Sequence, residues 1–525
     1  MPLNDALSGN MSELELAASE YGIDCVTSVE DCDFATEMLE QLPVEWAREN
    51  AMLPLRVNGR ACLLLSDPAA IDKQEYVSIL VGTELHPLLA PKELVLSCIE
   101  RCYFRQDNSP STFIDDLEEQ ADGSSAGHRE VNDLLQVTSE APVTQLINLI
   151  LLDAYKQNSS DIHIEPFENR VRVRYRIDGV LYEQSSPPAN MVQPLVSRLK
   201  VMAHMDIAER RLPQDGMARV SVGEHEIDIR VSTVPVTEGE RVVLRLLDKS
   251  NTLLSMADLG MEEKCGADFS RLLNSSNGII LVSGPTGSGK TTTLYAALGE
   301  LNSTRRNILT IEDPSEYQLD NIGQIQVKPK IGLTFSSGLR HILRQDPDVI
   351  LVGETRDTET AEIAIRAALT GHLVFTTLHT NDAPSAIVRL TDMGIAPYLI
   401  ASSLRGILAQ RLVRKLCVHC NEPHEVTASD LKSYGSAGAM LAGKSVRRAV
   451  GCEHCTDGYR GRLGIFELLT ITPKLRDIVR ESKCNLTDLR LAAAEENFDS
   501  LIYDGIAKVL NGITTMDEIL GSTSV

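Results

Sequence analysis

The sequence predicts an α/β protein of several domains, and three observations lead to this fold class. Residues 284–291 fit the pattern G-x-x-x-x-G-K-[ST] at every fixed position, between the apolar run 279–282 and a helical pattern over 292–301. Four apolar runs in the same region each end in a polar group, as the strands of a parallel sheet do at a ligand site. Over 170–177, arginine alternates with apolar residues, which is typical of a strand with one buried face.

The domain order follows from composition along the 525 residues. Residues 1–105 mix short apolar segments with turn residues, which predicts an N-terminal α/β domain. Residues 106–137 hold little that could be buried, so we expect a flexible linker there. Helical and then alternating apolar spacing predicts a second α/β domain over 138–249, and residues 250–525 form the domain that carries the glycine-rich loop.

The net charge of −24 is concentrated in the first part of the chain. Residues 1–150 hold 27 Asp and Glu against 8 Lys and Arg, whereas residues 151–525 hold 47 against 42. Nucleic acid and anionic lipid are bound through clustered Lys and Arg, so this acidic region argues against binding either of them directly. Two interpretations remain: the charge serves solubility alone, or this region docks on a basic protein surface.

The sequence favours a soluble protein of the cytoplasm. It contains no run of 18 apolar residues, and residues 1–15 lack the basic start and apolar core of a signal peptide. Eleven cysteines without a secretory signal indicate a reducing compartment, where metal ligation is a better explanation for paired cysteines than disulfides are.

The glycine-rich loop is expected to hold the phosphates of a nucleotide. Its glycines let backbone N–H groups surround phosphate oxygens at the positive end of the following helix. Lys290 would then meet the β- and γ-phosphates, and the Thr291 hydroxyl would ligate Mg²⁺. A glycine turn without a ligand is the alternative, but the full spacing disfavours it. The residues expected to bind nucleotide are Gly284, Pro285, Thr286, Gly287, Ser288, Gly289, Lys290, Thr291 and Thr292.

Two glutamates are candidates for activating or orienting the water that attacks the γ-phosphate. A strand rises about 3.3 Å per residue, so Asp348 lies on the order of 20 Å from Glu354 and only Glu354 is at the nucleotide end. Asp346 and Asp348 belong to the far end. Glu312 follows another apolar run and is the second carboxylate; the two glutamates could exchange the roles of base and water-mediated metal ligand. Glu312 could also be an ordinary strand-to-turn stop.

Two histidines flank the apolar run 373–377. His379, at the expected end of this strand, is placed to sense the γ-phosphate, whereas His372 lies at its start and would act away from the nucleotide. A histidine beside an apolar strand is more often a satisfied structural residue, so this alternative stays open for both.

Four cysteines have the spacing of a structural zinc site. C-x₂-C, a 31-residue gap and C-x₂-C predict a tetrahedral tetrathiolate with no open position, made by Cys417, Cys420, Cys452 and Cys455. His419, His424 and His454 are alternative ligands that the site does not require. The other cysteines are expected to be small buried hydrophobes: Cys25, Cys32, Cys62, Cys98, Cys102, Cys265 and Cys484.

Taken together, these motifs resemble a known family. The glycine-rich loop, the acidic box 310–314, the second acidic box ending at 353–357 and the histidine box 370–381 resemble the secretion ATPases of type II and type IV pilus systems. Segments 210–216, 230–235 and 239–249 are most similar to the type II secretion branch, the general secretion pathway protein E family. Met217 departs from it, because arginine is usual there; Arg219 is a possible substitute.

The resemblance implies a RecA-like P-loop ATPase core with an inserted zinc lobe over 414–463, preceded by a PAS-like domain and an N-terminal partner-docking domain. It also implies a hexameric ring at the inner membrane. Partners would be the cytoplasmic domain of an inner-membrane platform protein and the polytopic platform component. Arg230 and Arg245 would reach the phosphates from the second domain, and further arginines would act in nucleotide binding or subunit coupling: Arg340, Arg344 and Arg356.

The expected function is ATP hydrolysis that drives pseudopilus assembly and protein export, with pilus assembly as the alternative within the family. A non-hydrolysing nucleotide-gated scaffold would keep Lys290 but lose its carboxylates, and both Glu312 and Glu354 are present. A nucleic-acid motor would need a basic channel or domain, which the acidic first part of the chain does not favour.

Overall fold

The computed structural model describes two compact units, Met1–Ser250 and Asn251–Val525. Within them, the described residues are 18, 20–26, 32–33, 38, 42, 44–57, 60–104, 110–111, 114, 142–222, 225–248, 254–302, 304–481, 485–496 and 498–523. The division between the units lies beside the boundary expected at 249–250. The expected linker at 106–137 lies almost wholly outside the described residues, and the other domain bounds stay predictions.

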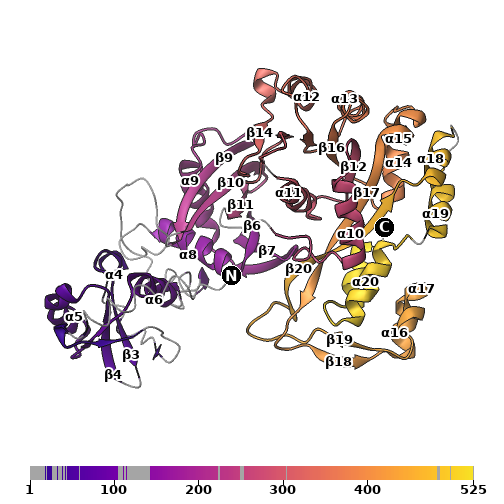
Figure 1. The fold of residues 1–525 in the computed structure, drawn as a ribbon. Coiled ribbons are helices and arrows are strands. Elements are labelled where there is room, and N and C mark those ends of the chain that lie inside the picture. The colour runs from indigo at the N-terminus through magenta and orange to yellow at the C-terminus, as the bar shows by residue number, and fades with distance from the viewer. Residues whose placement is uncertain are drawn as a thin grey trace. The chain divides into compact units, whose positions relative to one another are not determined.

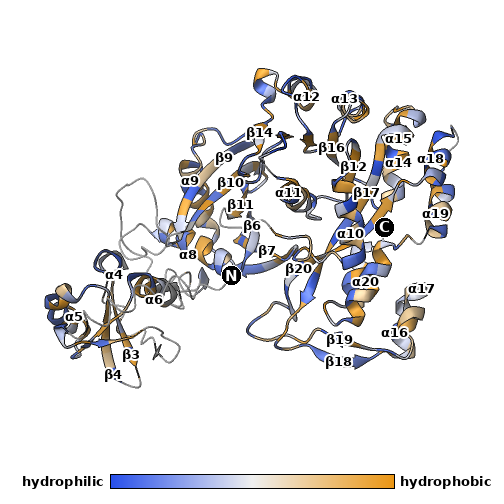
Figure 2. Ribbon diagram, viewed as in Figure 1, coloured by the Kyte–Doolittle hydropathy of each residue, from blue (hydrophilic) through white to orange (hydrophobic). Residues whose placement is uncertain are grey.

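The N-terminal part of the first unit is a five-stranded sheet in the order β1-β5-β4-β3-β2. These strands are β1 (Asp24–Cys25), β2 (Cys32–Asp33), β3 (Met52–Val57), β4 (Arg60–Leu65) and β5 (His86–Leu89). The strands β3 and β4 hold continuous apolar runs (Figure 2), so successive side chains pack on both faces of the sheet. Leu53 and Leu64 pack in one cluster with residues of α4 (Val44–Asn50) and α6 (Lys92–Phe104), and Met52 and Leu63 pack in another with α5 (Lys73–Val81).

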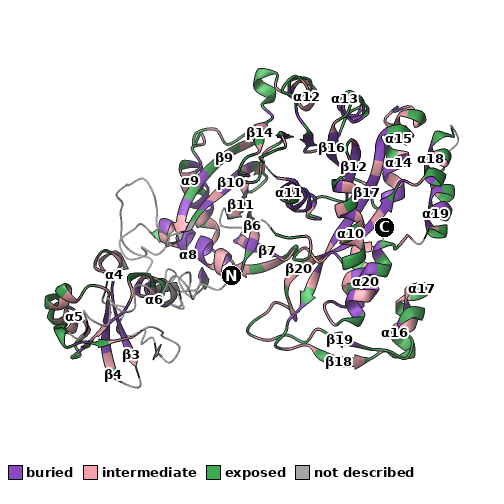
Figure 3. Ribbon diagram, viewed as in Figure 1, coloured by how far each residue is buried: buried purple, intermediate pink, exposed green. Residues whose placement is uncertain are grey.

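The second sheet of this unit is antiparallel and has the order β8-β7-β6-β11-β10-β9. Its strands are β6 (Ser159–Pro166), β7 (Val171–Ile177), β8 (Val180–Ser185), β9 (Gln214–Val222), β10 (His225–Val236) and β11 (Gly239–Asp248). One face packs in a single core with the buried residues of α8 (Pro142–Lys156) and α9 (Val192–Met202) (Figure 3). The other face carries the arginines of β7, where Glu165 pairs with Arg172 and Arg174.

The second unit is built on a seven-stranded sheet in the order β14-β13-β15-β16-β12-β17-β20 (Figure 1). All neighbours are parallel except β17 and β20. The strands are β12 (Gly278–Ser283), β13 (Ile308–Glu312), β14 (Gly323–Gln326), β15 (Val349–Val352), β16 (Leu373–Leu378), β17 (Leu404–Leu416) and β20 (Tyr459–Thr470).

Helices cover both faces of this sheet, so its central strands β12, β15 and β16 are buried along their whole length. On one face the core includes α12 (Phe335–Ile342), α13 (Thr358–Leu369), α14 (Ala383–Asp392), α15 (Pro397–Ser403), α18 (Pro473–Arg480) and α19 (Leu486–Glu495). On the other face it includes α10 (Glu263–Leu273) and α11 (Lys290–Leu301).

A lobe is inserted between β17 and β20. It contains β18 (Glu422–Glu425), β19 (Ser445–Arg448), α16 (Ala428–Ser433) and α17 (Gly435–Gly438), and its apolar residues pack with α20 (Leu501–Leu510) and α21 (Met516–Thr523). Because β17 and β20 are antiparallel neighbours, the two ends of the lobe meet. None of the helices that the structure describes is long and apolar enough to cross a membrane.

Candidate nucleotide site and metal centre

The glycine-rich loop joins β12 to α11, as the sequence predicts, although α11 begins at Lys290 rather than at 292. Gly284, Gly287 and Gly289 have φ of 153°, 78° and 84°, in the region that favours glycine. A Cβ on Gly284 would also lie 2.5 Å from the backbone oxygen of Gln410 and from Ser288 Oγ. The first glycine is therefore needed for the close approach of the loop to β17.

Lys290 lies folded against its own loop. Its Nζ donates to the carbonyl oxygens of Gly284 at 2.8 Å and Pro285 at 2.9 Å. Burial lowers the pKa of Lys290 to about 8, the nearby Glu354 carboxylate opposes this, and the Arg411 guanidinium adds to it. An anion placed beside this buried ammonium group would stabilise its positive charge.

Two of the predicted side chains gather near Lys290. Glu354 follows β15 by two residues and contacts Arg356 (Oε1 to Nη2, 2.6 Å) and His379, which follows β16 (Oε2 to Nε2, 3.8 Å). Burial and the Lys290 charge lower the pKa of His379, which favours its neutral form. The Thr377 hydroxyl donates to the Gly353 carbonyl at 2.7 Å and links these two strand ends.

The far end of the sheet is also as predicted. Asp348 precedes β15, and its Oδ2 accepts from the backbone N–H of Asn307 at 2.7 Å. His372 precedes β16, with its Nδ1 2.9 Å from the Ala367 carbonyl oxygen. Both residues hold connections at the edge opposite the glycine-rich loop.

Glu312 ends β13 but is enclosed by a hydrogen-bond network that the sequence motifs did not reveal. It is 3% exposed, and its oxygens accept from the hydroxyls of Tyr295 and Thr310, both at 2.5 Å. Gln324 Nε2 lies 3.3 Å from Glu312 Oε1. The network joins α11, β13 and β14, so only the tertiary fold brings its members together.

Sequence reasoning also missed two residues of β17. Gln410 is 1% exposed and its Nε2 donates to the Ser288 carbonyl of the loop at 2.5 Å. Arg411 donates to the carbonyl oxygens of Asn381 at 3.0 Å and Ser522 at 3.2 Å, which ties the histidine box to the C-terminal helix. The pairing of β17 with β12 places both residues beside the loop, and no local motif signals that pairing.

The loop region fits a phosphate-bearing ligand. Within the described residues, the buried Ser288 Oγ, Thr293 Oγ1 and Gln410 Oε1 make no hydrogen bond. Buried polar atoms are normally satisfied, so the two hydroxyls, which can donate to a phosphate oxygen, indicate that a polar ligand belongs beside this loop. Gln410 Oε1 can only accept a hydrogen bond and does not bear on a phosphate.

Arg230 and Arg245 lie side by side in the first unit. They are register partners on β10 and β11, and Met217 on β9 is the other partner of Arg230. Arg245 is more than half exposed and its Nε donates to Asp161 Oδ1 at 2.9 Å, while Arg219 donates to Asp228 at 2.8 Å. Met217 therefore lies at the end of a row that contains these two arginines.

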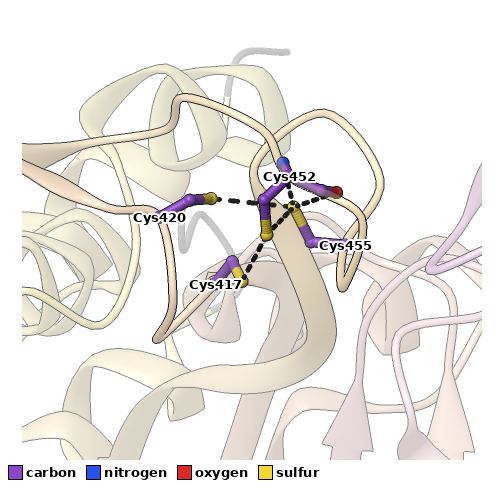
Figure 4. A group of neighbouring side chains, drawn as sticks. All are labelled: Cys417, Cys420, Cys452 and Cys455. Carbon is purple, nitrogen blue, oxygen red and sulfur yellow. Dashed lines mark hydrogen bonds between the residues drawn. The ribbon is translucent and has the colours of Figure 1, made fainter.

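The four predicted zinc ligands converge at the base of the lobe. Cys417 and Cys420 follow β17, and Cys452 and Cys455 precede β20; their side chains point toward one another (Figure 4). All four sulfurs lie within 4.8 Å of one another, and three of the separations are 3.9, 3.7 and 3.7 Å. Zn–S bonds of about 2.3 Å in a tetrahedron give sulfur separations of about 3.8 Å. The residues present therefore fit Zn²⁺.

The alternative ligands lie differently. The rings of His419 and His454 contact each other at 4.9 Å between centroids with a tilt of 56°, and His424 Nε2 contacts Asp430 at 3.0 Å. Of the remaining cysteines, Cys62, Cys98 and Cys102 are buried as predicted. Cys25, which ends the edge strand β1, and Cys265, in the first turn of α10, are half-buried and pack against the apolar cores, so the prediction holds for them only in part. The Cys32 side chain and Cys484 lie outside the described residues.

Comparison with known proteins decides the family. Residues 136–521 match the model described as "Type II/IV secretion system protein", and residues 21–109 match the MshEN domain. The chain belongs to the type II/IV secretion system protein family. The resemblance drawn from the motifs is thereby confirmed, as is the multidomain α/β fold class.

Relatives of this family member cover nearly its whole length. The type II secretion system protein E of Aeromonas hydrophila is 49% identical over 488 residues, which are 92% of this chain and 97% of that protein. The type IV pilus assembly ATPase PilB of Myxococcus xanthus is 40% identical over 514 residues, 97% of this chain and 90% of that protein. The crystal structure of the Legionella pneumophila ATPase DotB shares the fold, with a TM-score of 0.53 at 20% identity over 74% of this chain and 98% of that one.

Proposed function

We propose that this chain is the cytoplasmic ATPase of a type II secretion system, which hydrolyses ATP to drive pseudopilus assembly and protein export. The observation that carries the proposal is the gathering of Lys290, Glu354 and His379 at one edge of the parallel sheet, beside a loop of complete G-x-x-x-x-G-K-[ST] pattern. The higher identity to a type II secretion protein E than to a pilus assembly ATPase supports this branch.

The chemistry follows from these side chains. Backbone N–H groups of the loop and Lys290 bind the phosphates of ATP. The Thr291 hydroxyl would hold Mg²⁺, which neutralises phosphate charge when bound. Glu354 accepts the proton of the attacking water or orients that water, with Arg356 fixing one of its oxygens. His379, neutral and within 3.8 Å of the other oxygen, senses the γ-phosphate.

Arg230 and Arg245 would complete the site in an assembled ring. Guanidinium groups stabilise charge that spreads over a transferring phosphoryl group, and they can be withdrawn between steps. A homohexamer in which the second domain carries these arginines toward the phosphates couples ATP binding to domain movement, and hydrolysis releases them. The four cysteines hold Zn²⁺ and fix the lobe at its base.

The N-terminal domain is the proposed docking element. Its acidic charge suits a basic surface on the cytoplasmic part of an inner-membrane platform protein, so the chain would be peripherally associated with that membrane through its partners. The polytopic platform component would receive the movement of the ring. Nucleic acid has no place in this scheme.

Two measurements on the purified full-length chain test the proposal. Phosphate release from ATP should be catalytic, and binding of ATP without release would instead support the nucleotide-gated scaffold. Deleting residues 1–105 should abolish co-purification with the cytoplasmic domain of the platform protein while ATP turnover persists. As a matched control, co-purification of the full-length protein should also weaken at high salt, because salt screens the attraction between charged docking surfaces. Undiminished co-purification of the deletion variant would contradict the docking role.

A further inference from the structure

Tyr295 stands at the centre of the network that encloses Glu312. It lies on α11, the helix that begins with Lys290, and its side chain is fully buried. Its ring packs edge-on against Tyr317, with 4.7 Å between centroids. Its hydroxyl lies 2.5 Å from Glu312 Oε2. One side chain therefore joins the phosphate-binding helix to a carboxylate at the end of β13.

The direction of the Tyr295 hydroxyl proton follows from its other neighbours. The backbone N–H of Glu316 donates to the Tyr295 oxygen at 3.3 Å, and Gln324 Nε2 does so at 3.4 Å. Gln324 cannot reverse its amide without losing the bond that its Oε1 accepts from Leu319 N at 2.7 Å. Since both neighbours are donors, the hydroxyl proton of Tyr295 goes to Glu312. Burial, reinforced by this carboxylate, raises the pKa of Tyr295, so the hydroxyl keeps that proton.

Counting lone pairs shows what remains to Glu312. A carboxylate has about four acceptor positions, two on each oxygen. Oε1 accepts from Thr310 Oγ1 at 2.5 Å. Gln324 Nε2 lies 3.3 Å from Oε1, and its two N–H groups are shared among this oxygen, the Tyr295 hydroxyl at 3.4 Å and the Tyr317 carbonyl oxygen at 3.1 Å. Within the described residues, Oε2 accepts only from Tyr295. Oε2, the oxygen that the tyrosine holds, therefore keeps an open acceptor position.

We propose that Tyr295 is a positioning residue for ATP hydrolysis: its hydroxyl fixes Glu312 so that the remaining lone pair of Oε2 accepts a hydrogen bond from the water that attacks the γ-phosphate, or from a water bound to the metal. This inference rests on the proposed function. Because Tyr295 and Lys290 lie on the same helix, the carboxylate is held in register with the phosphate-binding element.

Tyr295→Phe tests the inference, because it removes the hydroxyl and leaves the ring contact. In the full-length chain we expect kcat for ATP to fall about 10- to 100-fold, as for a lost hydrogen bond to a charged group, while the Kd for ATP changes less than about twofold. Tyr317→Phe is the matched control: it removes the hydroxyl of the partner ring, which no hydrogen bond joins to Glu312 within the described residues, and kcat should stay within about twofold.

A double-mutant cycle shows whether Tyr295 acts through Glu312. If it does, Tyr295→Phe combined with Glu312→Gln is no slower than Glu312→Gln alone. Multiplicative losses would overturn the inference, as would an unchanged kcat in Tyr295→Phe or a parallel loss of kcat and ATP affinity with a lower Tm. A wild-type chain that binds ATP without releasing phosphate would contradict the proposed function instead, so the two failures are distinguishable.

Discussion

Glu467 on β20 provides a quantitative test of how the second unit is held together. It is 3% exposed, and its two oxygens accept from the backbone N–H groups of Ala383 at 2.6 Å and Leu501 at 3.0 Å. These are the first residues of α14 and α20, and α14 follows directly after the histidine box. One buried carboxylate thus caps two helices, one of which continues from the nucleotide site.

The magnitude follows from the pKa of this carboxyl. Burial raises the pKa of Glu467 to about 7 from its ordinary 4.5, and Asp382 adds to the rise, while the two backbone donors and Arg411 oppose it. Because the folded pKa is the higher one, this group's contribution to stability is full below pH 4.5 and is lost as pH rises to about 7. At about 1.4 kcal/mol per pH unit, the loss is about 3 kcal/mol.

Glu467→Gln removes the titration. The amide leaves one of the two buried backbone donors without an acceptor, so we expect it to destabilise the chain by about 1–3 kcal/mol at pH 5. Between pH 5 and 8 the wild type should lose about 2.5 kcal/mol more than the variant does, which makes the two similar at pH 8. Urea unfolding followed by circular dichroism at both pH values measures this difference. Equal pH dependence in the two proteins would refute the reasoning.

Three further predictions concern the site and the lobe. Cys417→Ser should release about one zinc per chain, seen by metal analysis, and lower the Tm of the lobe; a wild-type chain without metal would contradict the zinc assignment. Gln410→Ala should weaken ATP binding about 5- to 20-fold, because it frees the Ser288 carbonyl from β17. Titration with ATP measures the affinity, and the exposed-site variant Gln345→Ala is the control. Unchanged affinity would show that β17 does not hold the loop. Arg245→Ala should reduce turnover of the assembled protein with ATP affinity retained, whereas Arg170→Ala, at an exposed pair with Glu183, should not; equal effects would remove Arg245 from the site.

The sequence predicts those features that one short segment encodes. The glycine-rich loop and the position of Glu354 rather than Asp348 at the nucleotide edge depend on local spacing and on the direction of a single strand. A residue that follows a strand lies at the end of that strand whichever strands are its neighbours. These predictions therefore do not depend on the strand order of the sheet. The four-cysteine cluster is signalled by its repeated C-x₂-C spacing, although its two halves meet only through the pairing of β17 with β20.

Features that depend on strand order were not predictable in the same way. Gln410 and Arg411 reach the loop and the histidine box because β17 pairs with β12, more than a hundred residues earlier in the chain. The enclosure of Glu312 requires β14 beside β13 and α11 above them. The motifs do not distinguish Glu312 from Glu354. Only the fold shows that Glu312 is enclosed by hydrogen-bond donors, whereas Glu354 contacts Arg356 and His379.

The most direct test of the central claim is ATP hydrolysis by Glu354→Gln. In the full-length assembled chain, phosphate release should fall about 100-fold or more, as for loss of a general base, while the Kd for ATP stays within about threefold of wild type. Glu362→Gln, on the exposed side of α13 in a pair with Arg366, is the matched control and should turn over normally. Near-normal phosphate release by Glu354→Gln would contradict the account.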